Sequence, residues 1–129
     1  MSNTFDYSRA FSRNLGWVTQ KEQEILKQSC VGIAGLGGVG GNYLLTLCRL
    51  GVGQFHVADF DTFEIENFNR QVGARVSTIG HSKVSTLVAM AKDINPQVEI
   101  KVFDKGIQEE NLSQFCTGID LYIDGLDFF

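Results

Sequence analysis

The chain has 129 residues, of which 43% are hydrophobic and 20% charged, and its formal net charge is −4 at pH 7. These values are typical of one globular domain with a buried core, and the negative charge does not favour nonspecific binding to nucleic acid or membrane surfaces. No apolar run approaches the ~18 residues of a membrane span, and the three cysteines form no CxxC pair. We therefore expect a cytoplasmic protein without a membrane span, a zinc knuckle or a disulfide framework.

The first residues predict an N-terminal arm followed by a helix. Residues 1–18 alternate between polar and aromatic types and include Arg9, so we expect an extended arm. Thr19 lies three residues before Glu22, which is the spacing of a capping box, and predicts a short helix that ends near Gln28. The expected organisation is an arm over 1–18 and a nucleotide-binding domain over 19–129.

A glycine cluster lies between a predicted strand and a predicted helix. Residues 31–35 predict the strand, and residues 38–50 carry apolar side chains at helical spacing. Such a turn lets a phosphate approach backbone N–H groups at the positive end of a helix dipole. The spacing alone fits any dinucleotide-binding domain. The glycines expected to bind the nucleotide are Gly35, Gly37, Gly38 and Gly40.

Strands and helices alternate along the rest of the chain. We expect a strand over 54–58, a long loop over 62–80 with room for one helical turn, a helix over 82–94, a half-exposed strand over 98–102, a short helix over 108–115 and a buried strand over 119–123. This alternation predicts a Rossmann-like α/β fold, with a doubly wound and mostly parallel sheet of strand order 3-2-1-4. The chain stops just after a strand, so we expect an incomplete domain, truncated at the C-terminus.

Several polar residues follow the second predicted strand. Asp59 fits the acceptor of a ribose diol, although a turn or cap aspartate is the alternative. Asp61 could orient residues of the loop or help to hold a metal ion. A purely structural role in the turn is the alternative. A pyrophosphate is adequately held by the glycine turn, whereas Asn67, Arg70 and Lys83 would suit a triphosphate with more charge to neutralise. Taken singly, Arg and Lys residues in such a loop are more often solvated surface charges, and that is the favoured interpretation of each one alone.

Five motifs together resemble a known family. They are Gly-Leu-Gly-Gly-Val-Gly at 35–40, Asp-Phe-Asp at 59–61, Asn-x-Asn-Arg-Gln at 67–71, Lys83, and Ile-Asn-Pro at 94–96. In order and spacing, the chain resembles the ThiF/MoeB/HesA family of ubiquitin-activating-enzyme-like adenylyltransferases from about Tyr7 to Asp127. One departure is Phe128, where family members usually have asparagine.

The resemblance implies roles for individual residues. Asp59 would bind the ribose of ATP, and Asn67, Arg70 and Lys83 would hold its phosphates. Asp127 would be the Mg²⁺ ligand. Tyr7-Ser8-Arg9 is similar to an N-terminal motif whose arginine reaches the ATP site of the partner in a homodimer, which makes Arg9 a candidate arginine finger. The catalytic set implied is Arg9, Arg70, Lys83 and Asp127.

The resemblance also implies a reaction. A carboxylate oxygen attacks the α-phosphorus of ATP, releases pyrophosphate and leaves an acyl-adenylate. The expected substrate is the C-terminal glycine of a ubiquitin-like sulfur carrier protein. An alternative within the family is activation of tRNA threonylcarbamoyladenosine, whose enzymes share a segment much like residues 78–83. Two other classes stay open: an NAD-dependent oxidoreductase domain, and a noncatalytic module that binds a nucleotide or a partner.

Overall fold

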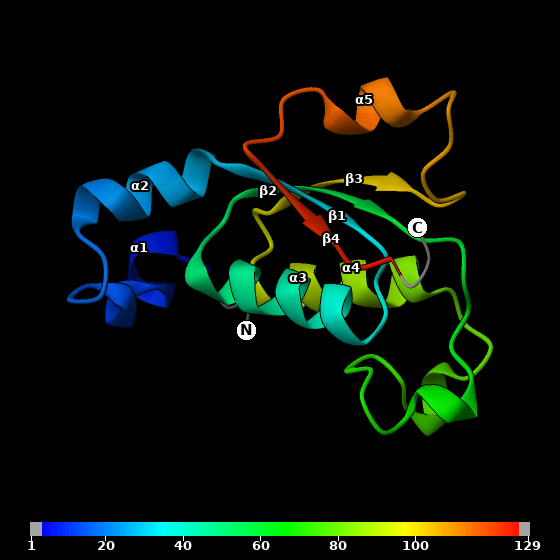
Figure 1. The fold of residues 1–129 in the computed structure, drawn as a ribbon. Helices are drawn as coiled ribbons and strands as arrows, with labels where there is room; N and C mark the ends of the chain where they lie inside the picture. Colours follow the sequence, from blue (N-terminus) through cyan, green and yellow to red (C-terminus); the bar gives the residue numbers. More distant parts are fainter. Residues whose placement is uncertain (1–3, 127–129) are drawn as a thin grey trace.

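The computed structural model describes residues 4–126, and within them four strands form a parallel sheet. The strand order is β3-β2-β1-β4, as Figure 1 shows. In register, Ala34 at the end of β1 lies between Ala58 of β2 and Asp124 of β4. The predicted Rossmann-like fold and its strand order are confirmed. The strands are β1 (Cys30–Ala34), β2 (Gln54–Ala58), β3 (Glu99–Phe103) and β4 (Leu121–Asp124).

Helices lie on both faces of the sheet. α3 (Gly38–Leu50) and α4 (Lys83–Ile94) lie below the sheet in Figure 1, and α5 (Leu112–Cys116) lies above it. The main core fills the space between the sheet and the first two helices, because their apolar faces repeat at helical spacing. A smaller cluster beneath α5 is formed by Ala34, Ala58, Phe103 and Phe115.

The element boundaries mostly agree with those expected from the sequence, but the environment of β4 does not. α3 and β2 have the predicted bounds, and β3 is half exposed at a sheet edge as expected. The expectation of a buried strand over 119–123 is wrong, since Leu121 is 54% exposed and Tyr122 47%. The reason is position: β4 pairs with β1 on one side and has no strand on its other side among residues 4–126.

The N-terminal segment is also not the extended arm that the sequence predicts. α1 (Tyr7–Ala10) and a 3₁₀ turn over Ser12–Asn14 precede α2 (Gln20–Gln28), whose capping box is confirmed. Tyr7 is buried, and its hydroxyl donates to the carbonyl oxygen of Gly51 at 2.6 Å. The extended conformation is wrong because aromatic residues of this segment pack: the Tyr7 and Phe11 ring centroids are 4.8 Å apart. The division at residue 19 stays a prediction.

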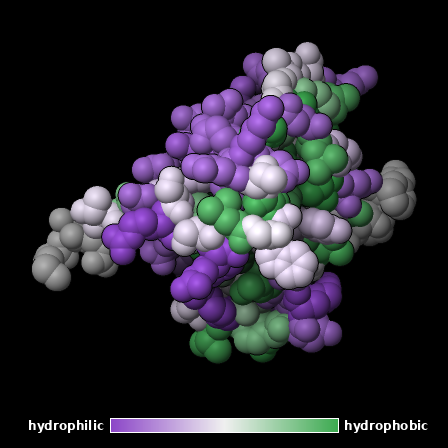
Figure 2. All heavy atoms as spheres, turned by 90° about the vertical axis from the view of Figure 1, so that its left-hand side faces the viewer, coloured by the Kyte–Doolittle hydropathy of each residue, from purple (hydrophilic) through white to green (hydrophobic). Residues whose placement is uncertain are grey.

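Figure 2 looks onto the end of the molecule where α1 and α2 lie, and hydrophobic and hydrophilic side chains are mixed on that face. The large exposed hydrophobic residues of this segment are Leu15, Trp17 and Ile25. The carboxyl ends of the strands lie at the opposite end of the molecule (Figure 1). No helix within residues 4–126 has the length and apolar character needed to cross a membrane.

The predicted long loop over 62–80 contains two 3₁₀ turns rather than one. They are η2 (Ile65–Asn67) and η3 (Val76–Thr78). The two ends of the loop are joined, because the Phe63 N–H donates to the His81 carbonyl at 3.0 Å and the Gly80 N–H to the Phe63 carbonyl at 2.8 Å. These bonds fix the loop beside the first turn of α4.

Candidate nucleotide-binding site

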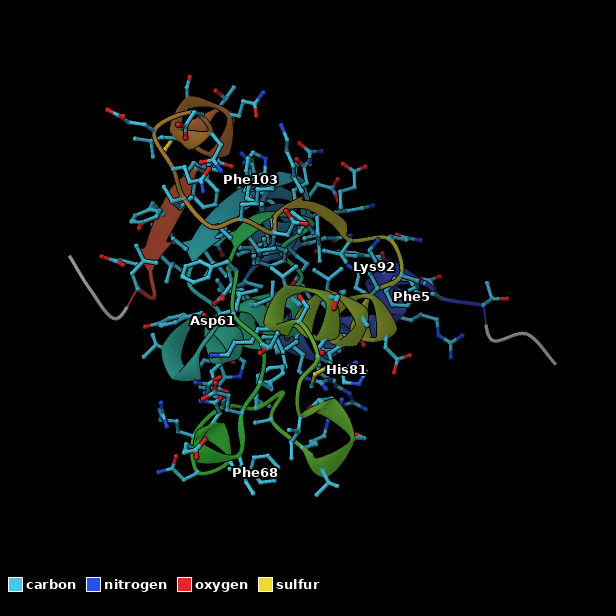
Figure 3. The ribbon with its side chains drawn as sticks, turned by 90° about the vertical axis from the view of Figure 1, so that its right-hand side faces the viewer. Phe5, Asp61, Phe68, His81, Lys92 and Phe103 are labelled. Atoms are coloured by element: carbon cyan, nitrogen blue, oxygen red, sulfur yellow. The ribbon has the colours of Figure 1, made fainter. Side chains whose placement is uncertain are left out.

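A cleft of about 350 Å³ opens at the carboxyl ends of β1 and β2. Figure 3 looks onto this end of the sheet, with Asp61 left of the centre and Phe68 on the loop below it. In open parallel sheets, ligands bind at such an edge, where the strand order reverses. The cleft is lined by Gly35, Gly37, Ala58, Asp59, Phe60, Asp61, Lys83, Gly125 and Leu126.

The glycine turn requires glycine at two positions for different reasons. Gly35 has φ +85°, and a Cβ there would lie 2.5 Å from the carbonyl oxygen of Gly125. A Cβ at Gly40 would overlap the carbonyl oxygen of Gly35. The turn is therefore compact, and it leads directly into α3. No side chain caps α3 at Gly37, so the N–H groups of the first helical turn are free for an anion.

Asp59 joins the glycine turn to the end of β2. Its Oδ2 accepts the backbone N–H of Leu36 at 2.7 Å, and its Oδ1 accepts the N–H of Asp61 at 2.7 Å. Each carboxylate oxygen can accept a further hydrogen bond, so the side chain can still receive a ribose hydroxyl. The prediction that Asp59 and the glycine turn face one cleft is confirmed.

Lys83 brings a buried positive charge into the cleft. The residue is 6% exposed, although it is the first residue of α4. Its Nζ lies 4.0 Å from Asp61 Oδ2, beyond hydrogen-bond distance, and 5.8 Å from the centroid of the Phe63 ring. Lysines are rarely buried without a close partner. This ammonium group is therefore suited to bind an anionic ligand that enters the cleft.

The loop residues Asn67 and Arg70 do not line the cleft. Asn67 Oδ1 accepts the N–H of Glu64 at 2.7 Å and thereby caps η2. The Arg70 guanidinium donates through Nη1 to the carbonyl of Glu66 at 3.2 Å and to Asn69 Oδ1 at 3.1 Å. The stem of Arg70 nevertheless lies against Gly38, since its Cγ would be 3.3 Å from a Cβ there. Arg70 thus stands beside the N-terminus of α3.

The structure therefore brings together part of the predicted set. Gly35, Gly37, Asp59, Asp61 and Lys83 line the cleft, and Gly38 and Gly40 form the turn beneath it. Arg9 lies on α1, which is bonded through Tyr7 to the far end of α3. An α-helix of this length spans about 20 Å, so Arg9 is remote from the cleft of its own chain. Asp127 lies outside the described residues.

The sequence interpretation missed four residues of the cleft, which are Ala58, Phe60, Gly125 and Leu126. Phe60 is 74% exposed and lines the wall, although it lies between two aspartates that were predicted. Its neighbour Gly106 comes from the segment after β3, a contact that chain spacing does not reveal. Gly125 and Leu126 close the cleft after β4. Their place follows from the pairing of β1 with β4, which strand order predicts but residue type does not.

The predicted Mg²⁺ site is not formed by the described residues alone. Within 4–126, no three His, Cys, Asp or Glu side chains gather closely enough to hold a metal ion. Asp59 and Asp61 supply hard carboxylate oxygens at the cleft, which is the donor type that Mg²⁺ prefers. Mg²⁺ usually retains water and binds through few carboxylates together with substrate phosphates. The donor chemistry of the cleft therefore fits Mg²⁺.

The chain belongs to the ThiF family, because the sequence model of that family matches residues 11–129. Among curated relatives, it is 40% identical over 118 residues to a Bacillus subtilis protein named tRNA threonylcarbamoyladenosine dehydratase, covering 91% of this chain and 46% of the relative. It is 35% identical over 107 residues to a probable molybdopterin-synthase adenylyltransferase of Porphyra purpurea, covering 83% and 28%. The chain thus spans less than half the length of these relatives.

Solved structures agree with the fold. The Escherichia coli tRNA N6-threonylcarbamoyladenosine dehydratase TcdA, in complex with AMP, matches with a TM-score of 0.91 and 25% identity, over 98% of this chain and 53% of that one. The same enzyme in complex with ATP has a TM-score of 0.91 at 24% identity, covering 99% and 53%. Family membership is confirmed, and the Rossmann-like fold is that of these enzymes.

Proposed function

We propose that this chain provides the nucleotide-binding part of an ATP-dependent adenylyltransferase. The observation that carries the proposal is the buried ammonium group of Lys83, which faces a cleft that also contains Asp59 and the uncapped start of α3. These are a point charge, a diol acceptor and a set of N–H donors, which together suit ribose and a polyphosphate. The ATP and AMP complexes of the similar E. coli enzyme support this interpretation.

The proposed reaction is nucleotidyl transfer to a carboxylate. A carboxylate oxygen forms a bond to the α-phosphorus of ATP, and the bond from that phosphorus to the bridging oxygen breaks. Pyrophosphate leaves with the electron pair, and an acyl-adenylate is produced. The reaction needs no side-chain nucleophile, so the protein contributes positioning and electrostatic stabilisation.

Each residue has a defined part in this account. Asp59 orients the ribose, and the first-turn N–H groups of α3 and Lys83 Nζ bind phosphate oxygens. The Arg70 guanidinium donates through Nη1 to the Glu66 carbonyl and the Asn69 side chain, and its Nε and Nη2 groups would donate to phosphate oxygens. Mg²⁺, bound through Asp127, would neutralise charge on the leaving pyrophosphate. Arg9 would act on the site of a second copy in a homodimer, because it is remote from its own cleft.

Two carboxylates are candidates for the substrate. The first is the C-terminal glycine of a ubiquitin-like sulfur carrier, supported by the similarity to the Porphyra purpurea adenylyltransferase. The second is the threonylcarbamoyl group of a modified tRNA, favoured by the higher identity to the Bacillus subtilis dehydratase. Both substrates would be met in the cytoplasm.

ATP–pyrophosphate exchange tests the proposal. In the presence of Mg²⁺, we expect label from pyrophosphate to enter ATP when the correct carboxylate is added. A sulfur carrier ending in glycine and a threonylcarbamoyl-modified tRNA are the two additions to compare. The variant Lys83→Met should lose the exchange. Tight binding of NAD, with no ATP binding and no exchange under either addition, would overturn the proposal in favour of an oxidoreductase domain.

A further inference from the structure

The cleft that is proposed to bind a polyphosphate has a negatively charged lining. Among the described residues, its charged side chains are Asp59, Asp61 and Lys83, which are two carboxylates and one ammonium group and give a net charge of −1. Arg70 stands beside the start of α3 but is not part of this lining. A polyphosphate that enters without a cation therefore brings more negative charge to a lining that is already negative.

The two carboxylates differ in how far the protein compensates their charge. Asp59 accepts the backbone N–H groups of Leu36 and Asp61, both at 2.7 Å. Asp61, labelled in Figure 3, is held through its backbone, since its N–H donates to Asp59 and its carbonyl accepts the N–H of Lys83 at 3.0 Å. Its carboxylate is 56% exposed and lies 4.0 Å from Lys83 Nζ, beyond hydrogen-bond distance. The charge of Asp61 is therefore the less compensated of the two.

The Asp61 carboxylate is close enough to a bound phosphate to act on it. A phosphate oxygen held by Lys83 would lie about 2.8 Å from Nζ, and Asp61 Oδ2 lies 4.0 Å from the same nitrogen. The two oxygens are therefore at most about 7 Å apart, which is within the Debye length of about 8 Å at physiological salt. Like charges at this separation repel, and the repulsion grows with the charge of the phosphate chain.

We propose that Asp61 makes the cleft selective for the cation-bound form of the nucleotide: its carboxylate opposes the metal-free polyphosphate and tolerates the Mg²⁺ complex, whose negative charge is smaller. In the free chain, the same carboxylate offsets the Lys83 ammonium group. When Lys83 bonds a phosphate instead, the Asp61 charge faces the ligand. This inference rests on the proposed function, because it requires that the cleft takes ATP, and it makes Asp61 a determinant of specificity.

The variant Asp61→Asn tests the inference, because it removes the charge and keeps the shape of the side chain. Isothermal titration calorimetry gives the dissociation constant of ATP in EDTA and in Mg²⁺. The variant should bind metal-free ATP about 3-fold to 10-fold more tightly than wild type, and Mg²⁺·ATP no more than about 2-fold more tightly. The ratio of the two dissociation constants therefore falls. Asp93→Asn, the same charge change at an exposed position of α4 outside the cleft, should leave this ratio unchanged.

A second variant separates the lost charge from the new amide of asparagine. Asp61→Ala adds no hydrogen-bond donor, so the same fall in the ratio is expected from it. An unchanged ratio would overturn the inference, and so would weaker binding of ATP in both media, which would show that Asp61 instead positions Lys83. If wild type bound ATP equally well in EDTA and in Mg²⁺, the inference would fail while the proposed function stood. Absence of ATP binding in both media would overturn the proposed function together with it.

Discussion

The carboxylate of Asp59 accepts the backbone N–H of Leu36 at 2.7 Å, which ties the end of β2 to the glycine turn after β1. The same side chain accepts the N–H of Asp61. A residue predicted from the sequence as a ribose acceptor is thus also a structural link between two strands. Its two roles can be separated by the choice of substitution.

We expect Asp59→Asn and Asp59→Ala to differ in stability but to agree in binding. Asparagine retains one side-chain oxygen that can accept from Leu36, whereas alanine leaves both N–H groups without their acceptor. The alanine variant should lose about 1.5–3 kcal/mol of unfolding free energy, the cost typical of a hydrogen bond to a charged group. Both variants should bind ATP more weakly. Urea unfolding and calorimetric titration measure the two quantities, and equal stability of the variants would contradict the link.

The burial of Lys83 predicts that its charge serves binding rather than stability. Lys83→Met should lower ATP affinity roughly 10-fold to 100-fold, because a charge-assisted contact to phosphate is lost. The melting temperature of the free chain should not fall, since the ammonium lies 4.0 Å from the Asp61 carboxylate and 5.8 Å from the Phe63 ring centroid, and neither contact is close. Lys92→Met is the matched control on the exposed surface of the same helix (Figure 3). A large loss of stability in Lys83→Met would show that the residue is mainly structural.

The N-terminal segment should contribute to stability without contributing to nucleotide binding within one chain. Tyr7→Phe removes the donor to the Gly51 carbonyl and leaves that buried oxygen unpaired, at a cost of about 1–3 kcal/mol. ATP affinity should be unchanged, because this contact lies at the end of α3 remote from the cleft. Tyr43→Phe, at a residue that is 48% exposed on α3, is the control and should be neutral. A loss of ATP affinity in Tyr7→Phe would contradict the view that the C-terminal end of α3, which Tyr7 contacts, is independent of the nucleotide cleft at its N-terminal end.

The cysteines should differ in reactivity according to burial. Burial raises the pKa of the Cys48 thiol to about 11, and burial together with the Asp120 charge raises the pKa of Cys30. Cys116 is exposed. Because the thiolate is the reactive form, iodoacetamide at pH 8 should modify Cys116 in the folded chain and spare the other two. Mass spectrometry of tryptic peptides reads the outcome, and rapid labelling of Cys48 would contradict its packing.

The raised pKa of Cys48 makes the unfolding free energy depend on pH in the alkaline range. The Cys48 thiol is harder to ionise in the folded chain than in the unfolded chain. Its contribution to the unfolding free energy is therefore complete below the ordinary thiol pKa and is lost as pH rises toward about 11. The unfolding free energy should therefore fall over this range, and part of the fall should be absent in Cys48→Ala. Urea titrations from pH 8 to pH 11 measure it. If the wild type and Cys48→Ala showed the same dependence of unfolding free energy on pH, the raised pKa of Cys48 would be contradicted.

The sequence predicted the features that depend on neighbouring residues, and it failed where distant segments meet. The glycine turn, Asp59 and the strand order follow from local pattern and from the handedness of strand–helix–strand units. The burial of Tyr7 depends on Gly51, which lies 44 residues away, and no spacing rule reports this contact. Likewise, the exposure of Leu121 depends on which strands flank β4 rather than on its apolar composition.

The candidate site shows the same division. Residue type and order identified Lys83, but its burial results from the loop that folds back through the Phe63 and His81 bonds. Arg70 was predicted to hold phosphates, yet in this structure its guanidinium bonds the Glu66 carbonyl and Asn69. These local bonds engage Nη1 of the guanidinium, and a sequence cannot indicate them.

The most direct test of the central claim is the affinity of the chain for ATP compared with NAD, measured by isothermal titration calorimetry with and without Mg²⁺. The account predicts that ATP binds one site at least roughly 10-fold more tightly than NAD, and that Lys83→Met removes this preference while Lys92→Met retains it. Tighter binding of NAD, unaffected by Lys83→Met, would contradict a triphosphate site and leave the cleft as that of a dinucleotide-binding domain.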